Sequence, residues 1–146
     1  KGTPQNLVPF LTQTAIGKRP LLKVFGSNYN TPDGTCIRDY IHVMDLAQAH
    51  IDSIYYLISS SQKLTCEIFN VGTGQGVSVL EVIKEFENTT SKSVPYKLSD
   101  PRKGDTVAAY ADVKKINNQL GWKAKFSLKE ALQSAWNWEK ELDKKS

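Results

Sequence analysis

One stretch, residues 31–46, constrains this chain more than any other, because it predicts a turn, a strand and a helix start in immediate succession. Pro32-Asp33-Gly34 is typical of a turn, since proline presets φ and glycine accepts a positive φ. The run from Arg38 to Val43 predicts a short strand. Asp45 is then placed to cap a helix, with Gln48 as its capping-box partner. We therefore expect Arg38 and its neighbours to lie on a rigid strand.

The rest of the chain alternates short strands with helices. Helices are predicted from apolar residues at helical spacing, from serine caps with a glutamate three residues later, and from glycine stops. The predicted helices are 6–16, 45–58, 78–88, 112–120 and the segment that follows Ser127, and the predicted strands are 21–25, 38–43, 66–71 and 94–98. This order indicates the α/β or α+β class. The strands are too few for a covered parallel sheet, so we expect the main sheet to lie in a part of the protein outside this sequence.

Composition excludes several classes of function. The chain has 146 residues, enough for one compact domain, and no apolar run of about 18 residues that predicts a membrane span. The net charge of +4 comes from scattered lysines without interleaved aromatics, so we expect no nucleic-acid partner. Cys36 and Cys66 lack metal-ligand spacing, which favours free thiols in a cytoplasmic protein and no metal site. Because the chain begins at Lys1, we expect it to be part of a longer protein.

The loop Gly72-Thr-Gly-Gln-Gly76 lies between a predicted strand and a predicted helix, where a dinucleotide-binding loop would lie. That fingerprint needs a third glycine five residues after the first, and Val77 occupies this position. A tight turn is therefore the favoured interpretation. A weaker possibility is that the amides of Ser78 and Val79 face a ligand at a helix N-terminus.

Tyr110 and Lys114 match the Tyr-x-x-x-Lys spacing of a catalytic pair, which requires both side chains on one helical face. Asp112 is the expected N-cap of the following helix, so Tyr110 precedes that helix. We interpret the match as a coincidence of spacing.

Several motifs, in order, resemble the UDP-glucose 4-epimerases of the extended short-chain dehydrogenase/reductase superfamily. The segment 34–46 resembles their Gly-Thr-x-x-Arg-Asp-Tyr-Ile-His-Val-x-Asp-Leu motif. Further matching segments are Pro4–Phe10, Leu22–Gly26, Phe69–Gly74, Pro101–Asp105, Leu120–Trp122 and Trp136–Trp138. Motifs that match in series are more specific than any one alone.

The resemblance implies that residues 1–146 are the C-terminal, UDP-sugar-binding domain of a Rossmann-type epimerase. The N-terminal domain, absent from this sequence, would bind NAD and carry the catalytic tyrosine and lysine. The intact enzyme would invert C4 of the hexose through a 4-keto intermediate in galactose metabolism, in the cytoplasm, as a homodimer. No catalytic or cofactor-binding residue is expected in this chain, which alone should be inactive.

The resemblance assigns five residues to the diphosphate and ribose. Arg38 and Arg102 would clamp the diphosphate, because guanidinium forks match phosphate oxygens. Asp105 would accept hydrogen bonds from ribose hydroxyls, although a salt bridge or helix cap is its alternative. Asn6 and Leu7 would contact the diphosphate side. For Arg38, a surface ion pair with its neighbouring aspartate remains open.

Five further residues are assigned to the rest of the cleft. Lys23 and Phe25 would meet uracil through the main chain and a ring edge. Tyr40 and Val79 would line the cleft, and core packing is the alternative for both and for Phe25. Ala109 stands where related enzymes carry either a tyrosine or a small residue. A small residue leaves room for a 2-acetamido group, which implies acceptance of UDP-N-acetylhexosamines.

Two rival functions remain open. One is another NAD-dependent epimerase, dehydratase or decarboxylase of nucleotide sugars from the same superfamily. The other is a nucleotide-sugar-binding module without catalysis.

Overall fold

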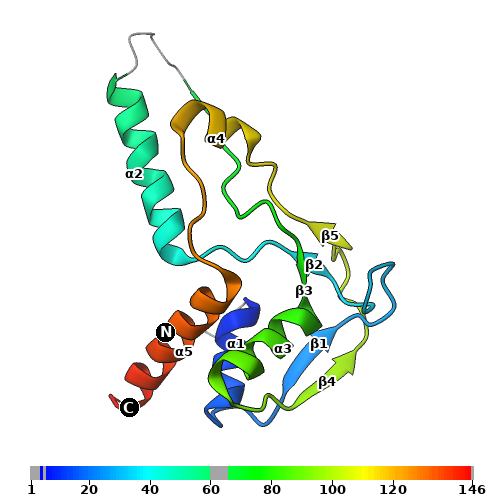
Figure 1. The fold of residues 1–146 in the computed structure, drawn as a ribbon. Helices are drawn as coiled ribbons and strands as arrows, with labels where there is room; N and C mark the ends of the chain where they lie inside the picture. Colours follow the sequence, from blue (N-terminus) through cyan, green and yellow to red (C-terminus); the bar gives the residue numbers. More distant parts are fainter. Residues whose placement is uncertain (1–3, 5, 60–65, 146) are drawn as a thin grey trace.

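The structure of this chain is a computed structural model that describes residues 4, 6–59 and 66–145. The chain has a mixed α/β fold, as the sequence predicts, with helices arranged around two small sheets (Figure 1). The helices of the described residues are α1 (Leu7–Ala15), α2 (Val43–Ser59), α3 (Val79–Thr90), α4 (Lys114–Leu120) and α5 (Leu128–Asp143). The strands are β1 (Leu22–Phe25), β2 (Ile37–Arg38), β3 (Val77–Ser78), β4 (Tyr96–Ser99) and β5 (Ala108–Ala109).

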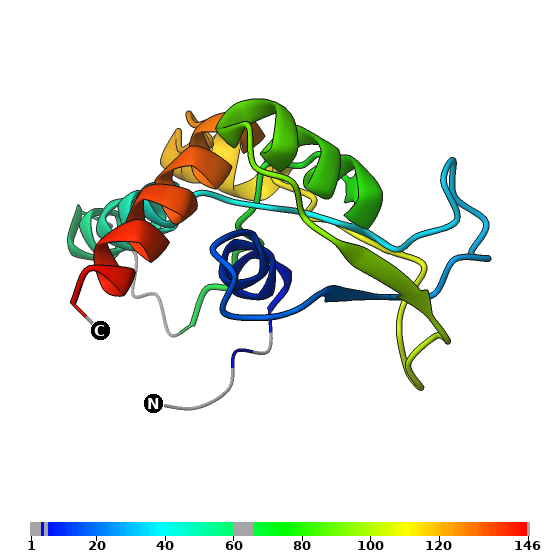
Figure 2. The ribbon, with the colours of Figure 1, turned by 90° about the horizontal axis from the view of Figure 1, so that it is seen from below.

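The larger hydrophobic core lies between α1, α3, α5 and the parallel pair β1–β4, in the lower half of Figure 1. Figure 2 shows α3 and α5 side by side in the upper part of the view, with α1 below them. Phe86 of α3 and Trp136 of α5 meet edge to face, with ring centroids 5.8 Å apart. Leu11 of α1 and Leu132 of α5 are also fully buried. Burial of these side chains fixes the position of α1 and β1, which both reach the site described below.

A second, smaller core lies where α4 crosses α2. It comprises Ala49, Ile116 and Trp122, with Phe69 and Val71 packed against it. The indole Nε1 of Trp122 donates a hydrogen bond to the carbonyl oxygen of Asp45 at 3.1 Å. The two halves of the chain are joined by a three-stranded sheet in which β2 pairs antiparallel with β3 and parallel with β5.

Local signals predict the helix ends well where the cap is a serine or a glycine. Ser78 and Ser127 form complete capping boxes with Glu81 and Glu130, which confirms both predictions. Gly121 ends α4 with a φ of 67°, in the left-handed region that glycine adopts without strain. These ends are predictable because a cap is a contact between residues close in sequence.

The predicted start of α2 is wrong. The helix begins at Val43, and strand β2 ends at Arg38, so the strand does not reach Val43. His42 caps the helix, because its Nδ1 accepts a hydrogen bond from the amide of Met44 at 3.0 Å. Asp45 therefore lies inside the first turn. There is no capping box with Gln48, whose side-chain amide donates to Asp52 instead.

Three smaller predictions also need correction. Residues 66–71 form no strand. Phe69 and Val71 pack on the second core, Ile68 is exposed, and no strand of the described residues pairs with this segment. The N-cap of α4 is Val113 rather than Asp112, although the Asp112 carboxylate still accepts a hydrogen bond from the Lys114 amide. The region 99–109, expected to be irregular, contains the short strand β5.

Membrane-spanning helices and clusters of metal-ligating residues are both absent from the described part of the chain. Within residues 4, 6–59 and 66–145, no helix has the length and apolar character needed to cross a membrane. The same residues contain no cluster of three or more metal-ligating side chains.

The Asp45 carboxylate fastens α2 to the segment that enters α5. It is 2% exposed and accepts hydrogen bonds from the amides of Lys125, at 3.1 Å, and Phe126, at 3.0 Å. We expect Asp45→Asn to lower the free energy of unfolding by about 1.5–3 kcal/mol, because a buried charge-assisted acceptor is lost. Urea denaturation of the intact protein measures this change.

The matched control is Asp52→Asn on the same helix, where the carboxylate accepts a hydrogen bond from the exposed side-chain amide of Gln48 and from no buried backbone amide of the described residues. This variant should lose less than about 0.5 kcal/mol. Equal losses in the two variants would show that the buried contacts of Asp45 contribute no particular stability.

Candidate functional site

A cavity of about 650 Å³ opens beside α1, β1, β2 and the start of α3. Segments far apart in sequence form its wall, including the loop that follows β4. Nine of the ten residues predicted to bind a UDP-sugar line it, namely Asn6, Leu7, Lys23, Phe25, Arg38, Tyr40, Val79, Arg102 and Asp105. The tenth, Ala109, is exposed on β5, and its partner in the parallel ladder is Arg38. The fold therefore gathers the predicted set around one space.

Arg38 and Arg102 converge on the carboxylate of Asp105. Nη2 of Arg38 lies 3.7 Å from one carboxylate oxygen, and Nε of Arg102 lies 3.3 Å from the other. Asp105 is mostly buried, whereas the arginine side chains are 31% and 57% exposed. One negative charge between two positive charges leaves the cluster with a surplus of +1, which favours binding of an anion.

The two guanidinium groups are also held by neutral partners. Nη1 of Arg38 donates to the carbonyl oxygen of Ile37 at 2.8 Å. The guanidinium of Arg102 lies over the ring of Phe25, 4.7 Å from its centroid. Arg38 thus forms no ion pair with Asp39, which the sequence left open as its alternative role. The loop after β4 turns at Gly104, with a φ of 87°, and the amide of Asp105 donates to the carbonyl of Arg102.

Tyr40 enters the cavity wall as an uncharged phenol. Burial raises its pKa to about 12, and the positive charge of nearby Arg38 opposes this rise. A deprotonated Tyr40 is therefore absent at neutral pH, and the side chain contributes apolar surface and a hydroxyl group. Tyr40 also packs against the larger core, so its cleft and core roles coexist.

The carboxylate of Asp39 occupies the glycine-rich loop. It accepts hydrogen bonds from the amides of Thr73 at 2.9 Å, Gly74 at 3.0 Å and Ala111 at 3.2 Å. A Cβ at Gly72 would collide with this carboxylate. The loop is a tight turn, as predicted, but it encloses an anion that was not predicted, and its Thr73 and Gly74 amides are bonded to that carboxylate rather than free for a dinucleotide.

The weaker possibility of a ligand at the start of α3 is wrong. The amide of Ser78 donates to Glu81 at 2.8 Å, and the amide of Val79 donates to the carbonyl of Cys36 at 3.2 Å. These groups are already satisfied within the chain. Tyr110 precedes α4 while Lys114 is its first residue, so the structural basis for a catalytic Tyr–Lys pair on one helix is missing.

Sequence reasoning missed several residues of the cavity wall. Phe10 and Arg19 both line it, and so does the buried Cys36. The helical spacing placed Phe10 on the apolar face of α1 but carried no signal that part of this face borders a cavity. Arg19 follows a glycine stop, where nothing in the local pattern indicates a binding residue.

Comparisons with known proteins identify the family and the fold of this chain. Residues 1–135 match the family model described as GDP-mannose 4,6 dehydratase. The bifunctional UDP-glucose 4-epimerase and UDP-xylose 4-epimerase 3 of Arabidopsis thaliana is 49% identical over 138 residues, which cover 94% of this chain and 39% of that protein. The chain thus spans about two-fifths of the length of this curated relative.

Two crystal structures have closely similar folds. The UDP-glucose 4-epimerase of Stenotrophomonas maltophila, with bound NAD and formylated UDP-arabinopyranose, superposes with a TM-score of 0.94 at 41% identity, covering 100% of this chain and 43% of that one. The enzyme of Bifidobacterium longum, in complex with NAD+ and UDP, gives 0.87 at 42% identity, covering 97% and 41%. These likenesses confirm the predicted fold and the resemblance to UDP-glucose 4-epimerases. Since the family match extends over 135 of 146 residues, the chain belongs to the GDP-mannose 4,6-dehydratase family.

Proposed function

We propose that this chain is the UDP-sugar-binding domain of a UDP-glucose 4-epimerase. The observation that carries the proposal is the convergence of Arg38 and Arg102 on Asp105 in one cavity. The two arginines come from β2 and from the loop after β4, more than sixty residues apart in the sequence. Such a cluster is costly to assemble without an anion to bind, because like charges repel.

The cluster fits the diphosphate and ribose of the ligand. The exposed guanidinium groups donate in planar forks that match phosphate oxygens. Asp105 only accepts hydrogen bonds when ionised, which suits ribose hydroxyl donors. Asn6 and Leu7 lie at the N-terminus of α1, and the side chain of Asn6 forms no cap hydrogen bond there. The amide-rich end of that helix adds donors on the diphosphate side.

The main chain of β1 suits the edge of a uracil ring. The amides of Leu22 and Gly26 donate toward β4 and the residues that flank it. Because alternate residues of a parallel strand direct their amides and carbonyls to opposite edges, those of Lys23 and Phe25 face away from β4. This edge has no partner strand among the described residues, and its donors and acceptors can pair with a nucleobase.

NAD would be bound by a domain outside this sequence, because the one glycine-rich loop among the described residues is filled by Asp39. When bound, NAD supplies reversible removal of the hydride from C4 of the sugar. The contribution of this chain is to hold the diphosphate while the keto sugar turns. Apolar residues are exposed along α2, including Ile54, Leu57 and Ile58. An exposed apolar surface of this kind favours the interpretation that α2 packs against another domain in the intact protein. Cytoplasmic location, homodimer formation and a role in galactose metabolism remain predictions.

The rival functions give different products. A dehydratase of the same family would consume UDP-glucose and release a dehydrated keto sugar, and a binding module would release nothing. The intact protein, supplied with NAD and UDP-glucose, should form UDP-galactose and reach the same mixture from either sugar. Chromatography of the sugar nucleotides checks this, and any other main product would refute the proposal.

Removal of either clamp arginine should weaken substrate binding. We expect Arg38→Met and Arg102→Met each to raise KM for UDP-glucose about 10- to 100-fold in the intact protein, because charge-assisted hydrogen bonds to phosphate are lost. Steady-state kinetics checks this, with a smaller change expected in kcat. Lys103→Met is the matched control, since Lys103 is exposed beside Arg102 but does not line the cavity. Equal effects of all three variants would contradict a specific clamp.

The size of residue 109 should set the tolerance for a 2-acetamido group. We expect Ala109→Tyr to lower kcat/KM for UDP-N-acetylgalactosamine at least about tenfold relative to UDP-galactose, since the resemblance implies that the ring would occupy the space left for the acetamido group, and such crowding costs about 1–3 kcal/mol. Competition assays with the two substrates measure the ratio. Ala108→Tyr is the control, because successive residues of a strand face opposite sides. An unchanged ratio in Ala109→Tyr, or no activity of the parent protein on the acetamido sugar, would contradict this role.

A further inference from the structure

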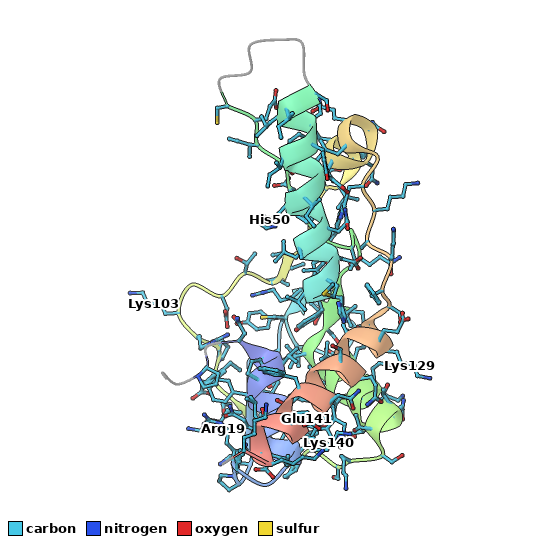
Figure 3. The ribbon with its side chains drawn as sticks, turned by 90° about the vertical axis from the view of Figure 1, so that its left-hand side faces the viewer. Arg19, His50, Lys103, Lys129, Lys140 and Glu141 are labelled. Atoms are coloured by element: carbon cyan, nitrogen blue, oxygen red, sulfur yellow. The ribbon has the colours of Figure 1, made fainter. Side chains whose placement is uncertain are left out.

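A third guanidinium group lines the cavity, and the proposed function gives it no role. Arg19 follows α1 and precedes β1, and it is partly buried. In Figure 3 it projects from the same left-hand side of the molecule as Lys103, which neighbours the clamp residue Arg102, and lies below it. The cavity thus carries a positive group in addition to the Asp105 cluster.

Arg19 is held in place by contacts with two residues of α1, Phe10 and Gln13. Its guanidinium lies over the ring of Phe10, 4.3 Å from the centroid. Its Nε donates to Oε1 of Gln13 at 2.7 Å, and its backbone amide donates to the carbonyl of the same residue at 3.3 Å. Within residues 4, 6–59 and 66–145, no hydrogen bond or ion pair engages its two terminal nitrogens. A restrained guanidinium with unused donors loses little rotamer entropy on binding a ligand.

The position of Arg19 along β1 separates it from the clamp. Arg19 lies three residues before Leu22, the first residue of β1, whereas Phe25, over which Arg102 stacks, is the last residue of this strand. A strand of this length spans about 10 Å between its first and last Cα atoms. A ligand whose diphosphate sits at the clamp would reach Arg19 only with a different part of its structure.

The surroundings of Arg19 describe that part. Phe10, over whose ring the guanidinium lies, also lines the cavity, and so do Leu21 and Leu22, which follow Arg19 closely in the sequence, so apolar side chains share this part of the wall with Arg19. A flat ring with a carbonyl oxygen at its edge fits an apolar wall with one donor-only group. A second phosphate fits less well, because anions prefer the doubly basic cluster and a polar wall.

We propose that Arg19 is a specificity-determining residue that donates a hydrogen bond to a carbonyl oxygen of the pyrimidine base. The inference rests on the proposed function, because it takes the ligand to be a uridine diphosphate sugar. Uracil carries two ring carbonyls, which accept hydrogen bonds. A guanidinium only donates hydrogen bonds, so it pairs with such an acceptor and not with an N–H group of the base. Arg19 thus adds to the main-chain edge of β1 a contact that depends on the base.

Binding of two probes to the intact protein tests the role. UDP carries the base, and ribose 5-diphosphate has the same ribose and diphosphate without it. We expect Arg19→Met, which keeps the apolar stem over Phe10, to weaken UDP binding at least about tenfold and to leave ribose 5-diphosphate binding unchanged. Arg102→Met should weaken both probes, and Lys103→Met should weaken neither. Calorimetry, with competition for the weaker probe, measures the dissociation constants.

The outcomes separate the inference from the proposed function. If the parent protein binds UDP, and Arg19→Met binds it equally well, Arg19 does not contact the base. If Arg19→Met weakens both probes by the same factor, Arg19 acts on the phosphates or only through the fold, and the inference is overturned. A parent protein that binds neither probe refutes the proposed function itself. Arg19→Lys keeps the positive charge but not the planar fork of donors. We expect it to bind UDP more weakly than the parent protein does. Full recovery of UDP affinity in this variant would overturn the inference, because charge alone would then be sufficient.

Discussion

The Asp39 carboxylate organises the junction on which the site depends. It accepts amide hydrogen bonds from the glycine-rich loop and from the segment that leads to α4, so three distant parts of the chain meet at one side chain. Each charge-assisted bond contributes about 1.5–3 kcal/mol. Asp39 directly follows Arg38 in the sequence, so this anchor also fixes where Arg38 enters the cavity.

Two other aspartates likewise accept several hydrogen bonds through one carboxylate. Asp33 accepts the amide and hydroxyl of Thr35 and the hydroxyl of Ser78, and these hydrogen bonds hold its pKa below the usual range although partial burial opposes this. Asp45 accepts two amides that precede α5. In each case the hydrogen bonds of a carboxylate hold a segment that belongs to no helix or strand. Irregular segments are thereby held firmly enough to support a binding site.

The charges of the cavity follow from this arrangement. Asp39 also lines the cavity, but its carboxylate is bonded to backbone amides, and among the described residues Asp105 is the carboxylate that forms ion pairs with Arg38 and Arg102. The cavity therefore keeps a positive surplus where the diphosphate is proposed to bind. Arg19 extends this surplus along β1, against an apolar wall and in contact with Phe10.

Much of the fold follows from local rules, and the exceptions have a common cause. The serine capping boxes at Ser78 and Ser127 and the glycine stop at Gly121 were predictable, since each involves residues within four positions. The start of α2 was mispredicted because Asp45 is an equally good cap by composition. Its carboxylate is drawn instead to amides eighty residues away. Likewise, residues 66–71 have the composition of a strand, but no strand in the part of the chain that the structure describes pairs with them.

The sequence by itself determined the class of fold, the family resemblance and the set of residues predicted to bind a sugar nucleotide. Motifs such as Arg38 to Leu46 and Arg102 to Asp105 are local strings, so they can be recognised without coordinates. Only the tertiary structure decided that two arginines share Asp105, that the glycine loop encloses Asp39, and that Arg19 borders the same cavity. These relations join residues that are remote along the chain, and packing of α1, α3 and α5 brings them together.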